Sequence, residues 1–444
     1  MLKLLGSSFK NCDGITRRNF LEVGSVPLLG LSLAEMLRLE ADAAPNPKKP
    51  NRKRSLIVFW THGGMSQQDT YDMKPNAPAE YRGMYRPIPT TVSGVQVGER
   101  FAQQAKVMQH ISVVRSVHHE NGIHAPSAHW MQTGYFGPTL ARIAPQKPSF
   151  GSVISRSLGA REPQMPPYVT VPKSEAFGYQ DSVYLGKAYN PFQVNGDPNS
   201  KNFKVPNLTL PGGLSVRSVQ NRRKLLKQFD KLQRSVDTKG VIEGLDTFKG
   251  QALEMVAGAR VRRAFDVSRE PAKLRDKYGR HMYGQAALLA RRLVQAGTRC
   301  VTINTGYWDH HNEIESGLEQ HLPPLDRAIW ALIEDLRDRG MLDDVMIYCA
   351  GEFGRTPLMN GHAGRDHWSN CFSVMLAGGG IQGGRMVGAS EKFGGGVLKR
   401  LATPLDVLAT IYERLGISLD THFVDSSGRP VSIVGSGKPI RELF

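Results

Sequence analysis

The stretch Val345-Met346-Ile347-Tyr348-Cys349-Ala350-Gly351-Glu352-Phe353-Gly354-Arg355 joins a short apolar run to a polar loop. Short continuous apolar runs are typical of buried strands in α/β proteins, and the ligands of such sheets bind in loops beyond the strands' carboxyl ends. The sequence therefore predicts a buried strand over 345–350, followed by a functional loop that holds Glu352 and Arg355.

The same arrangement occurs twice more in the chain. Residues 56–60 lead into a loop with Ser66, Asp69 and Thr70, and residues 300–304 lead into one with Asp309 and His311. A single Asp after a strand means little, because Asp is a common turn former and helix cap. Three such strand ends together favour a metal site or an acid/base site.

Asp309 and His311 are two residues apart, so in extended backbone their side chains point to the same side, as a chelating pair must. Carboxylate and imidazole ligands suit zinc, manganese, calcium or a similar divalent ion. The predicted metal ligands are Asp69, Asp309, His311, Glu352 and His367. The alternative is a set of turn-forming polar residues or a hydrogen-bond network without metal.

Several of these residues have a second possible role. Glu352 can bind metal or act as a general base, and Arg355 can hold an anionic group or pair with Glu352. Asp366 can orient His367 or be a ligand itself. Ser66 or Thr70 can be a nucleophile, or can simply stabilise a turn.

A histidine-rich loop follows the predicted strand over 111–117 and should open on the same edge of the sheet. It holds His118, His119, His124 and His129. Each can be a buried, hydrogen-bonded residue, and at least one is a candidate to reach the site.

The N-terminal 44 residues are typical of a twin-arginine signal peptide, with Arg17-Arg18, a modestly apolar segment and a small-residue stretch before a linker over 45–53. We expect one α/β domain over 54–444, with a mainly helical, charged insertion at about 215–295. Strands are also predicted over 168–171 and 372–377, and helices over 101–110, 124–132, 323–339 and 404–415. No apolar run is long enough and free enough of charge to span a membrane, so the mature chain is expected to be soluble and periplasmic or otherwise extracytoplasmic.

The formal net charge of +17 favours an anionic partner. The basic residues are dispersed, and no nucleic-acid-binding motif is present, so no nucleic-acid partner is expected. Cys300 and Cys349 fall inside predicted strands, which argues against a disulfide framework.

Taken together, these motifs resemble the domain-of-unknown-function 1501 family, whose members are exported by the twin-arginine route and are placed in the alkaline phosphatase and sulfatase superfamily. The pieces that carry the resemblance are Gly63-Gly64-x-Ser66-x-x-Asp69-Thr70-x-Asp72, Trp308-Asp309-x-His311, Gly351-Glu352-Phe353-Gly354-Arg355-Thr356-Pro357, Gly364-Arg365-Asp366-His367-Trp368 and Gly378-Gly379-Gly380. The resemblance implies a three-layer αβα fold, one or two divalent metals and a Ser, Thr or modified Cys nucleophile. Glu352-Phe353 departs from it, since it stands where phosphatases of the superfamily have an Asp-His pair.

Two hypotheses follow. The first is an exported, metal-dependent hydrolase of phosphate or sulfate monoesters, including esters on glycans, with Ser66 or Thr70 as nucleophile. The second is a non-catalytic secreted protein that binds anionic envelope or matrix polymers through the same crevice.

Overall fold

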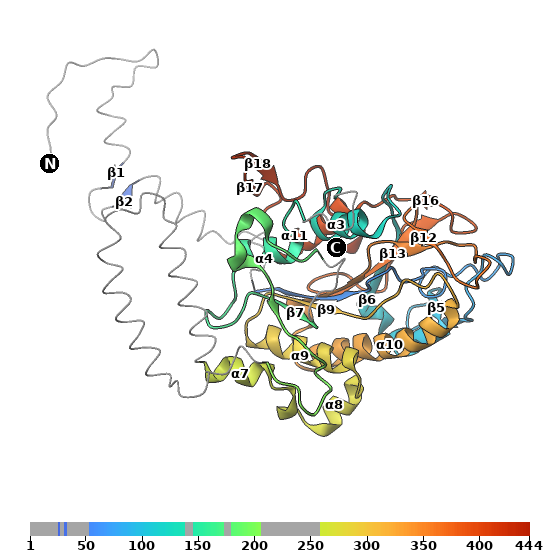
Figure 1. The fold of residues 1–444 in the computed structure, drawn as a ribbon, viewed down its shortest axis with the longest axis horizontal. Helices are drawn as coiled ribbons and strands as arrows, with labels where there is room; N and C mark the ends of the chain where they lie inside the picture. The colour runs from blue at the N-terminus through green and yellow to red at the C-terminus, as the bar shows by residue number, and fades with distance from the viewer. Residues whose placement is uncertain (1–24, 27–30, 33–52, 138–144, 173–178, 206–257) are drawn as a thin grey trace, which may run out of the picture. The chain divides into compact units, whose positions relative to one another are not determined.

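The computed structural model describes residues 25–26, 31–32, 53–137, 145–172, 179–205 and 258–444 (Figure 1). The chain divides into two compact units, Met1–Lys49 and Pro50–Phe444. In the first unit, strand β1 (Ser25–Val26) pairs antiparallel with β2 (Leu31–Ser32). The rest of the predicted signal, the linker up to residue 52 and the predicted insertion up to residue 257 lie outside the described residues.

An eight-stranded sheet forms the centre of the second unit. Its strands are, in spatial order, β14 (Met386–Val387), β6 (Ile111–Val117), β13 (Phe372–Gly378), β10 (Val345–Ala350), β3 (Ser55–Trp60), β9 (Cys300–Asn304), β7 (Tyr168–Val171) and β8 (Phe192–Gln193). Strand β13 is antiparallel to both neighbours, whereas the other neighbouring pairs are parallel. The carboxyl ends of β6, β10, β3 and β9 therefore meet at one edge of the sheet, and β13 begins there.

The predicted strands are confirmed, and their apolar character has a clear cause. Every residue of β3, β9 and β10 is buried, as expected for strands of a sheet that is covered on both faces. Alternate side chains of β3 enter two separate cores, with Ile57 and Phe59 in one and Val58 and Trp60 in the other.

Helices cover both faces of the sheet, which gives the expected three-layer αβα arrangement (Figure 1). One layer contains α7 (Ala259–Phe265), α8 (Ala272–Tyr278), α9 (Met282–Ala296) and α10 (Ile314–Asp338). The other contains α3 (His124–Thr133), α4 (Phe150–Leu158) and α11 (Pro404–Leu415). The described residues from 258 to 296 are mainly helical.

The predicted helix over 404–415 is confirmed as α11, and local chemistry explains its start. The Thr403 side chain accepts a hydrogen bond from Asp406 N, and the Asp406 carboxylate accepts one from Thr403 N. This capping box satisfies two amide groups at the helix end, and Pro404 follows in the first turn, where its missing N–H costs nothing.

The prediction for residues 323–339 was wrong at its start, because α10 begins at Ile314 and contains Pro323 and Pro324. Proline lacks the N–H that an interior helical position donates, so it is typical of the first turn of a helix. The apolar stripe of α10 continues through Leu318 and Leu322, which are fully buried. Burial of this stripe outweighs the lost hydrogen bonds.

The remaining elements are short. They comprise the 3₁₀ helices η1 (Glu99–Phe101), η2 (Gln104–His110), η3 (Val183–Leu185), η4 (Lys187–Tyr189), η7 (Val267–Arg269), η8 (Leu342–Asp344) and η9 (Arg441–Leu443), and the strand pairs β4 (Pro87–Pro89) with β5 (Gln96–Gly98), β11 (Gly354–Arg355) with β12 (His367–Trp368), β15 (Ala389–Ser390) with β16 (Val397–Lys399), and β17 (His422–Val424) with β18 (Pro430–Ser432). The helix predicted over 101–110 thus takes 3₁₀ form. Cys300, Cys349 and Cys371 are buried and free. Among the described helices, none is both long and apolar enough to cross a membrane.

Candidate metal centre

Side chains from four segments meet at the edge where β13 begins. The loop after β9 supplies Asp309 and His311, and β12, which leads into β13, supplies His367. Helix α3, which follows β6, supplies His124 from its first turn. The loop after β10 supplies Glu352.

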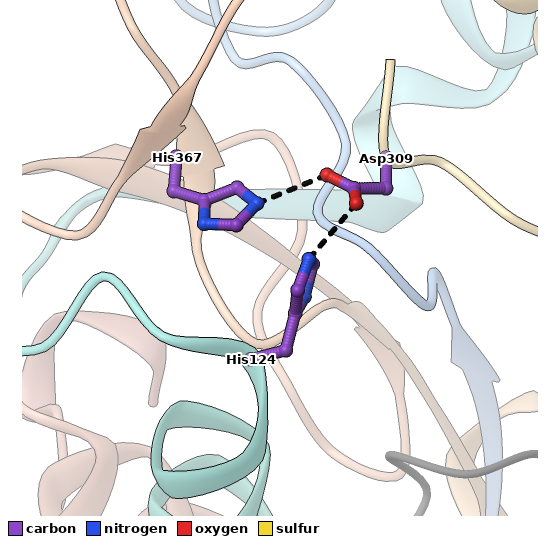
Figure 2. Close-up of side chains that lie close together, drawn as sticks. All are labelled: His124, Asp309 and His367. Carbon is purple, nitrogen blue, oxygen red and sulfur yellow. Dashed lines mark hydrogen bonds and ion pairs between the residues drawn. The ribbon is translucent and has the colours of Figure 1, made fainter. Parts of the chain in front are cut away.

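Asp309 lies at the centre of this cluster, and Figure 2 shows two imidazoles directed at its two carboxylate oxygens. His124 Nε2 lies 3.0 Å from Oδ2, and His367 Nε2 lies 3.0 Å from Oδ1. His311 Nε2 also lies 3.0 Å from Oδ1 and 2.9 Å from His367 Nε2. One ligand atom from each of His124, Asp309 and His367 falls within 4.8 Å of the others.

The outer nitrogen of each of these imidazoles is held by an oxygen. His124 Nδ1 lies 2.7 Å from Glu352 Oε1, His367 Nδ1 lies 2.7 Å from the Gly122 carbonyl oxygen, and His311 Nδ1 lies 2.6 Å from Asp366 Oδ1. A carbonyl or carboxylate oxygen only accepts, so the hydrogen-bond network assigns a proton to each Nδ1. In the neutral rings, three Nε2 lone pairs then face the carboxylate of Asp309.

Lone pairs and a carboxylate repel one another unless a cation lies among them. The donor set therefore fits a divalent ion such as zinc or manganese, with His124, His367, His311 and Asp309 to hold it. Histidines oriented by an outer hydrogen bond are a regular feature of protein metal sites.

Without a metal, protons provide the positive charge in this cluster. Burial opposes protonation of His124, but its hydrogen bonds to Asp309 and Glu352 outweigh burial and raise its pKa to about 9. Burial likewise opposes ionisation of Asp309, yet the hydrogen bonds from His124 and His367 and the charge of Arg355 hold its pKa well below the usual range. Asp309 is thus a carboxylate at neutral pH.

Arg355 is fully buried and points at Asp309 rather than at solvent. Its guanidinium donates to the carbonyl oxygens of Gly63, Gly64 and Arg365 and to Asp309 Oδ1. Protein acceptors therefore occupy four of its five N–H groups, which leaves little capacity for the predicted anion. Tyr307 also donates to Asp309, with 2.7 Å between its hydroxyl and Oδ2.

The structure places Ser66, Asp69 and Thr70 in a closed network within the loop after β3, where all three are buried. Ser66 Oγ donates to Asp69 Oδ2 at 2.5 Å, and Thr70 Oγ1 donates to the Ser66 carbonyl oxygen at 2.7 Å. Arg365, also fully buried, contacts Asp69 Oδ2 at 3.1 Å. Among the described contacts, none joins these three residues to Asp309 or its histidines.

Of the predicted ligands, the structure thus brings Asp309, His311 and His367 together, with Glu352 beside them. His124 is absent from the predicted ligand set. The sequence gives only its loop, with four histidines, as a candidate to bring at least one of them to the site. Two other histidines of that loop have different partners. Burial lowers the pKa of His119 to about 4, and its Nε2 donates to the Glu352 carbonyl oxygen, whereas His129 donates to the Tyr135 carbonyl oxygen. Asp366 contacts His311 instead of orienting His367.

Comparisons with known structures find similar folds at low identity. A sulfatase from Pseudoalteromonas sp. is 11% identical, with a TM-score of 0.37, and the match covers 86% of this chain and 70% of that one. The lipoteichoic acid synthase from Listeria monocytogenes is 11% identical, with a TM-score of 0.38 and coverages of 85% and 75%. A protein in the alkaline phosphatase superfamily from Vibrio parahaemolyticus is 10% identical, with a TM-score of 0.38 and coverages of 83% and 69%. At these scores the likeness says nothing about activity.

A search among curated proteins found no match. A family model described as "Protein of unknown function (DUF1501)" matches residues 53–444.

Proposed function

The chain belongs to the DUF1501 family, and from the geometry of its site we propose that it is a metal-dependent hydrolase of phosphate or sulfate monoesters, including esters on glycans. The observation that carries the proposal is the convergence of three imidazole Nε2 atoms on Asp309, each 3.0 Å from a carboxylate oxygen. A divalent ion held there would act as a Lewis acid on an ester oxygen. The net charge of +17 supports an anionic substrate.

The protein's own groups orient the site. Arg355 and Tyr307 hold the Asp309 carboxylate from outside the histidine cluster, so we assign Arg355 to positioning Asp309 rather than to binding the anion. We assign the attack on the ester to solvent water, because Ser66 and Thr70 are buried and hydrogen-bonded within their own loop.

The test is metal content and turnover on the mature protein, beside the Asp309→Ala/His311→Ala double variant. We expect bound zinc, manganese or calcium by elemental mass spectrometry, and hydrolysis of 4-nitrophenyl phosphate or sulfate that the double variant lacks. Absence of metal and of turnover from the native protein would overturn the proposal.

Binding of anionic polymers through the crevice of the histidine cluster is the second candidate, and a set of exposed basic side chains on other elements also favours an anionic partner. Helix α7, the 3₁₀ turn η7 and the start of helix α8 expose five basic side chains, which are Arg260, Arg262, Arg263, Arg269 and Lys273. These residues lie on elements that contribute nothing to the histidine cluster. This candidate predicts salt-sensitive binding to dextran sulfate that survives Glu352→Ala, and it fails if that variant abolishes a measurable turnover.

We also propose export by the twin-arginine route, on the basis of Arg17-Arg18 and the segment that follows. A chain with both arginines replaced by lysine should accumulate in the cytoplasm, as shown by cell fractionation. Normal export of that variant would contradict the proposal.

A further inference from the structure

Glu352 occupies a fixed position behind the histidine cluster. Its side chain is fully buried, and Oε1 accepts hydrogen bonds from Gly63 N at 2.8 Å and from His124 Nδ1 at 2.7 Å. Its carbonyl oxygen accepts a hydrogen bond from His119 Nε2. Both its backbone and its carboxylate are thus held by neighbouring segments.

The two nitrogens of an imidazole point in different directions. A group that is hydrogen-bonded to one nitrogen therefore lies away from a metal ion that is bound to the other. His124 presents Nδ1 to Glu352 and Nε2 to Asp309. The ligand atoms of His124, Asp309 and His367 all lie within 4.8 Å of one another, and Glu352 is not part of this group. We propose that Glu352 is a positioning residue that orients His124 and raises its basicity as a ligand, instead of binding the metal directly. This inference rests on the proposed metal site.

Gly63 explains why Glu352 keeps its orientation. The Gly63 N–H that holds Oε1 is a backbone group, and the residue has a φ of +102°. A Cβ at this position would lie 2.5 Å from Asp309 N, so only glycine fits between the two loops. The same glycine therefore fixes the distance between Glu352 and the segment that carries Asp309.

Of the three groups that hold the outer nitrogens of these histidines, the Glu352 carboxylate is the one that is both charged and fully buried. His367 is held by the Gly122 carbonyl oxygen, which carries no net charge, and His311 is held by Asp366, whose side chain is 54% exposed. A buried carboxylate acts on its histidine without screening by water. His124 is therefore the histidine whose metal binding depends most on its outer partner.

The experiment compares zinc binding by the native protein with Glu352→Gln. Glutamine can accept the same hydrogen bonds through its amide oxygen, so the fold is kept while the charge is removed. We expect unchanged zinc stoichiometry and an affinity about 10- to 100-fold lower, measured by chelator competition. In ¹H–¹⁵N spectra of the zinc-loaded protein, the His124 Nδ1–H resonance should be present in both and shifted in the variant.

Glu270→Gln is the matched control, because Glu270 is a largely buried carboxylate that pairs with Arg291 and Arg292 and lies outside the cluster. It should change thermal stability and leave zinc affinity as in the native protein. Unchanged zinc affinity in Glu352→Gln would overturn the inference in favour of a structural role. Loss of stoichiometric zinc from that variant would overturn it in favour of a direct ligand that uses Oε2, which is buried and has no partner among the described residues. A native protein that binds no zinc, manganese or calcium would instead remove the proposed metal site, and the inference with it.

Discussion

Asp69 and Asp309 both follow buried parallel strands, yet one closes a loop and the other faces a group of histidines. The partners of Asp69 include Ser66 and Arg365, which bring their own hydrogens to the carboxylate. Asp309 also accepts hydrogen bonds from Arg355 and Tyr307, but it faces in addition three imidazole Nε2 atoms. The proton of each neutral ring is on Nδ1, which donates it to an outer oxygen. Whether a carboxylate after a strand stabilises a loop or binds metal therefore depends on the hydrogen-bonding capacity of its partners.

The largest effect is expected from Asp309→Ala, which removes the centre of the histidine cluster. Bound metal should be lost and hydrolysis should fall by more than about 100-fold, since even changes to outer partners cost up to about that much. Elemental mass spectrometry and initial rates measure the two losses. Full metal occupancy in the variant would show that Asp309 is not the central ligand.

Asp69→Ala should affect the other region and act on stability. It leaves the buried Arg365 without its carboxylate, which costs about 3–5 kcal/mol of unfolding free energy. Guanidinium denaturation measures this loss, and metal content should stay as in the native protein. The control is Asp276→Ala, which breaks an exposed pair with Arg280 and should change the free energy of unfolding by less than about 1 kcal/mol. Loss of metal from Asp69→Ala at normal stability would restore the prediction that Asp69 is a ligand.

Metal affinity should rise with pH, because an ion must displace the second proton of His124. The metal-free protein holds that proton below about pH 9, so affinity should fall roughly tenfold for each unit below this value. Titration calorimetry in buffers of different ionisation enthalpy should show about one proton released per ion at pH 7. Release of no proton would contradict the arrangement around His124.

The smallest effect is expected from Ser66→Ala, which removes one buried hydrogen bond and costs about 1 kcal/mol. Turnover of the folded variant should stay close to that of the native protein, and Thr70→Ala should behave in the same way. A drop in kcat of several orders of magnitude, with normal metal content, would identify Ser66 as the nucleophile and move the chemistry into the loop after β3.

The sheet was predictable because burial on both faces leaves a direct mark on sequence. Residues 56–60, 300–304 and 345–350 are continuous apolar runs, and the structure pairs them as adjacent parallel strands. The start of α10 was not predictable, since Pro323 is a local signal that burial of Leu318 and Leu322 overrides.

Within the site, Asp309, His311 and His367 were predictable as a group because each follows or precedes a strand at the same edge. His124 was recognisable only as one of four histidines, since its position depends on the irregular segment between β6 and α3. The partner of Asp69 could not be foreseen from local pattern, because Arg365 lies 296 residues away in the chain.

The reversed direction of β13 has a consequence for how the chain folds. Because β13 runs against its neighbours, His367 arrives at the edge where a strand starts, while Asp309 arrives where another ends. His124 and Asp309 are 185 residues apart, and Asp309 and His367 are 58 apart. We expect such distant segments to meet late in folding, because the entropy of closing a long loop is lost before the contacts that compensate it form. Metal capture would therefore mark a chain whose sheet is complete. Bound metal would protect that chain against unfolding by a free energy that grows with the logarithm of the free metal concentration relative to the dissociation constant.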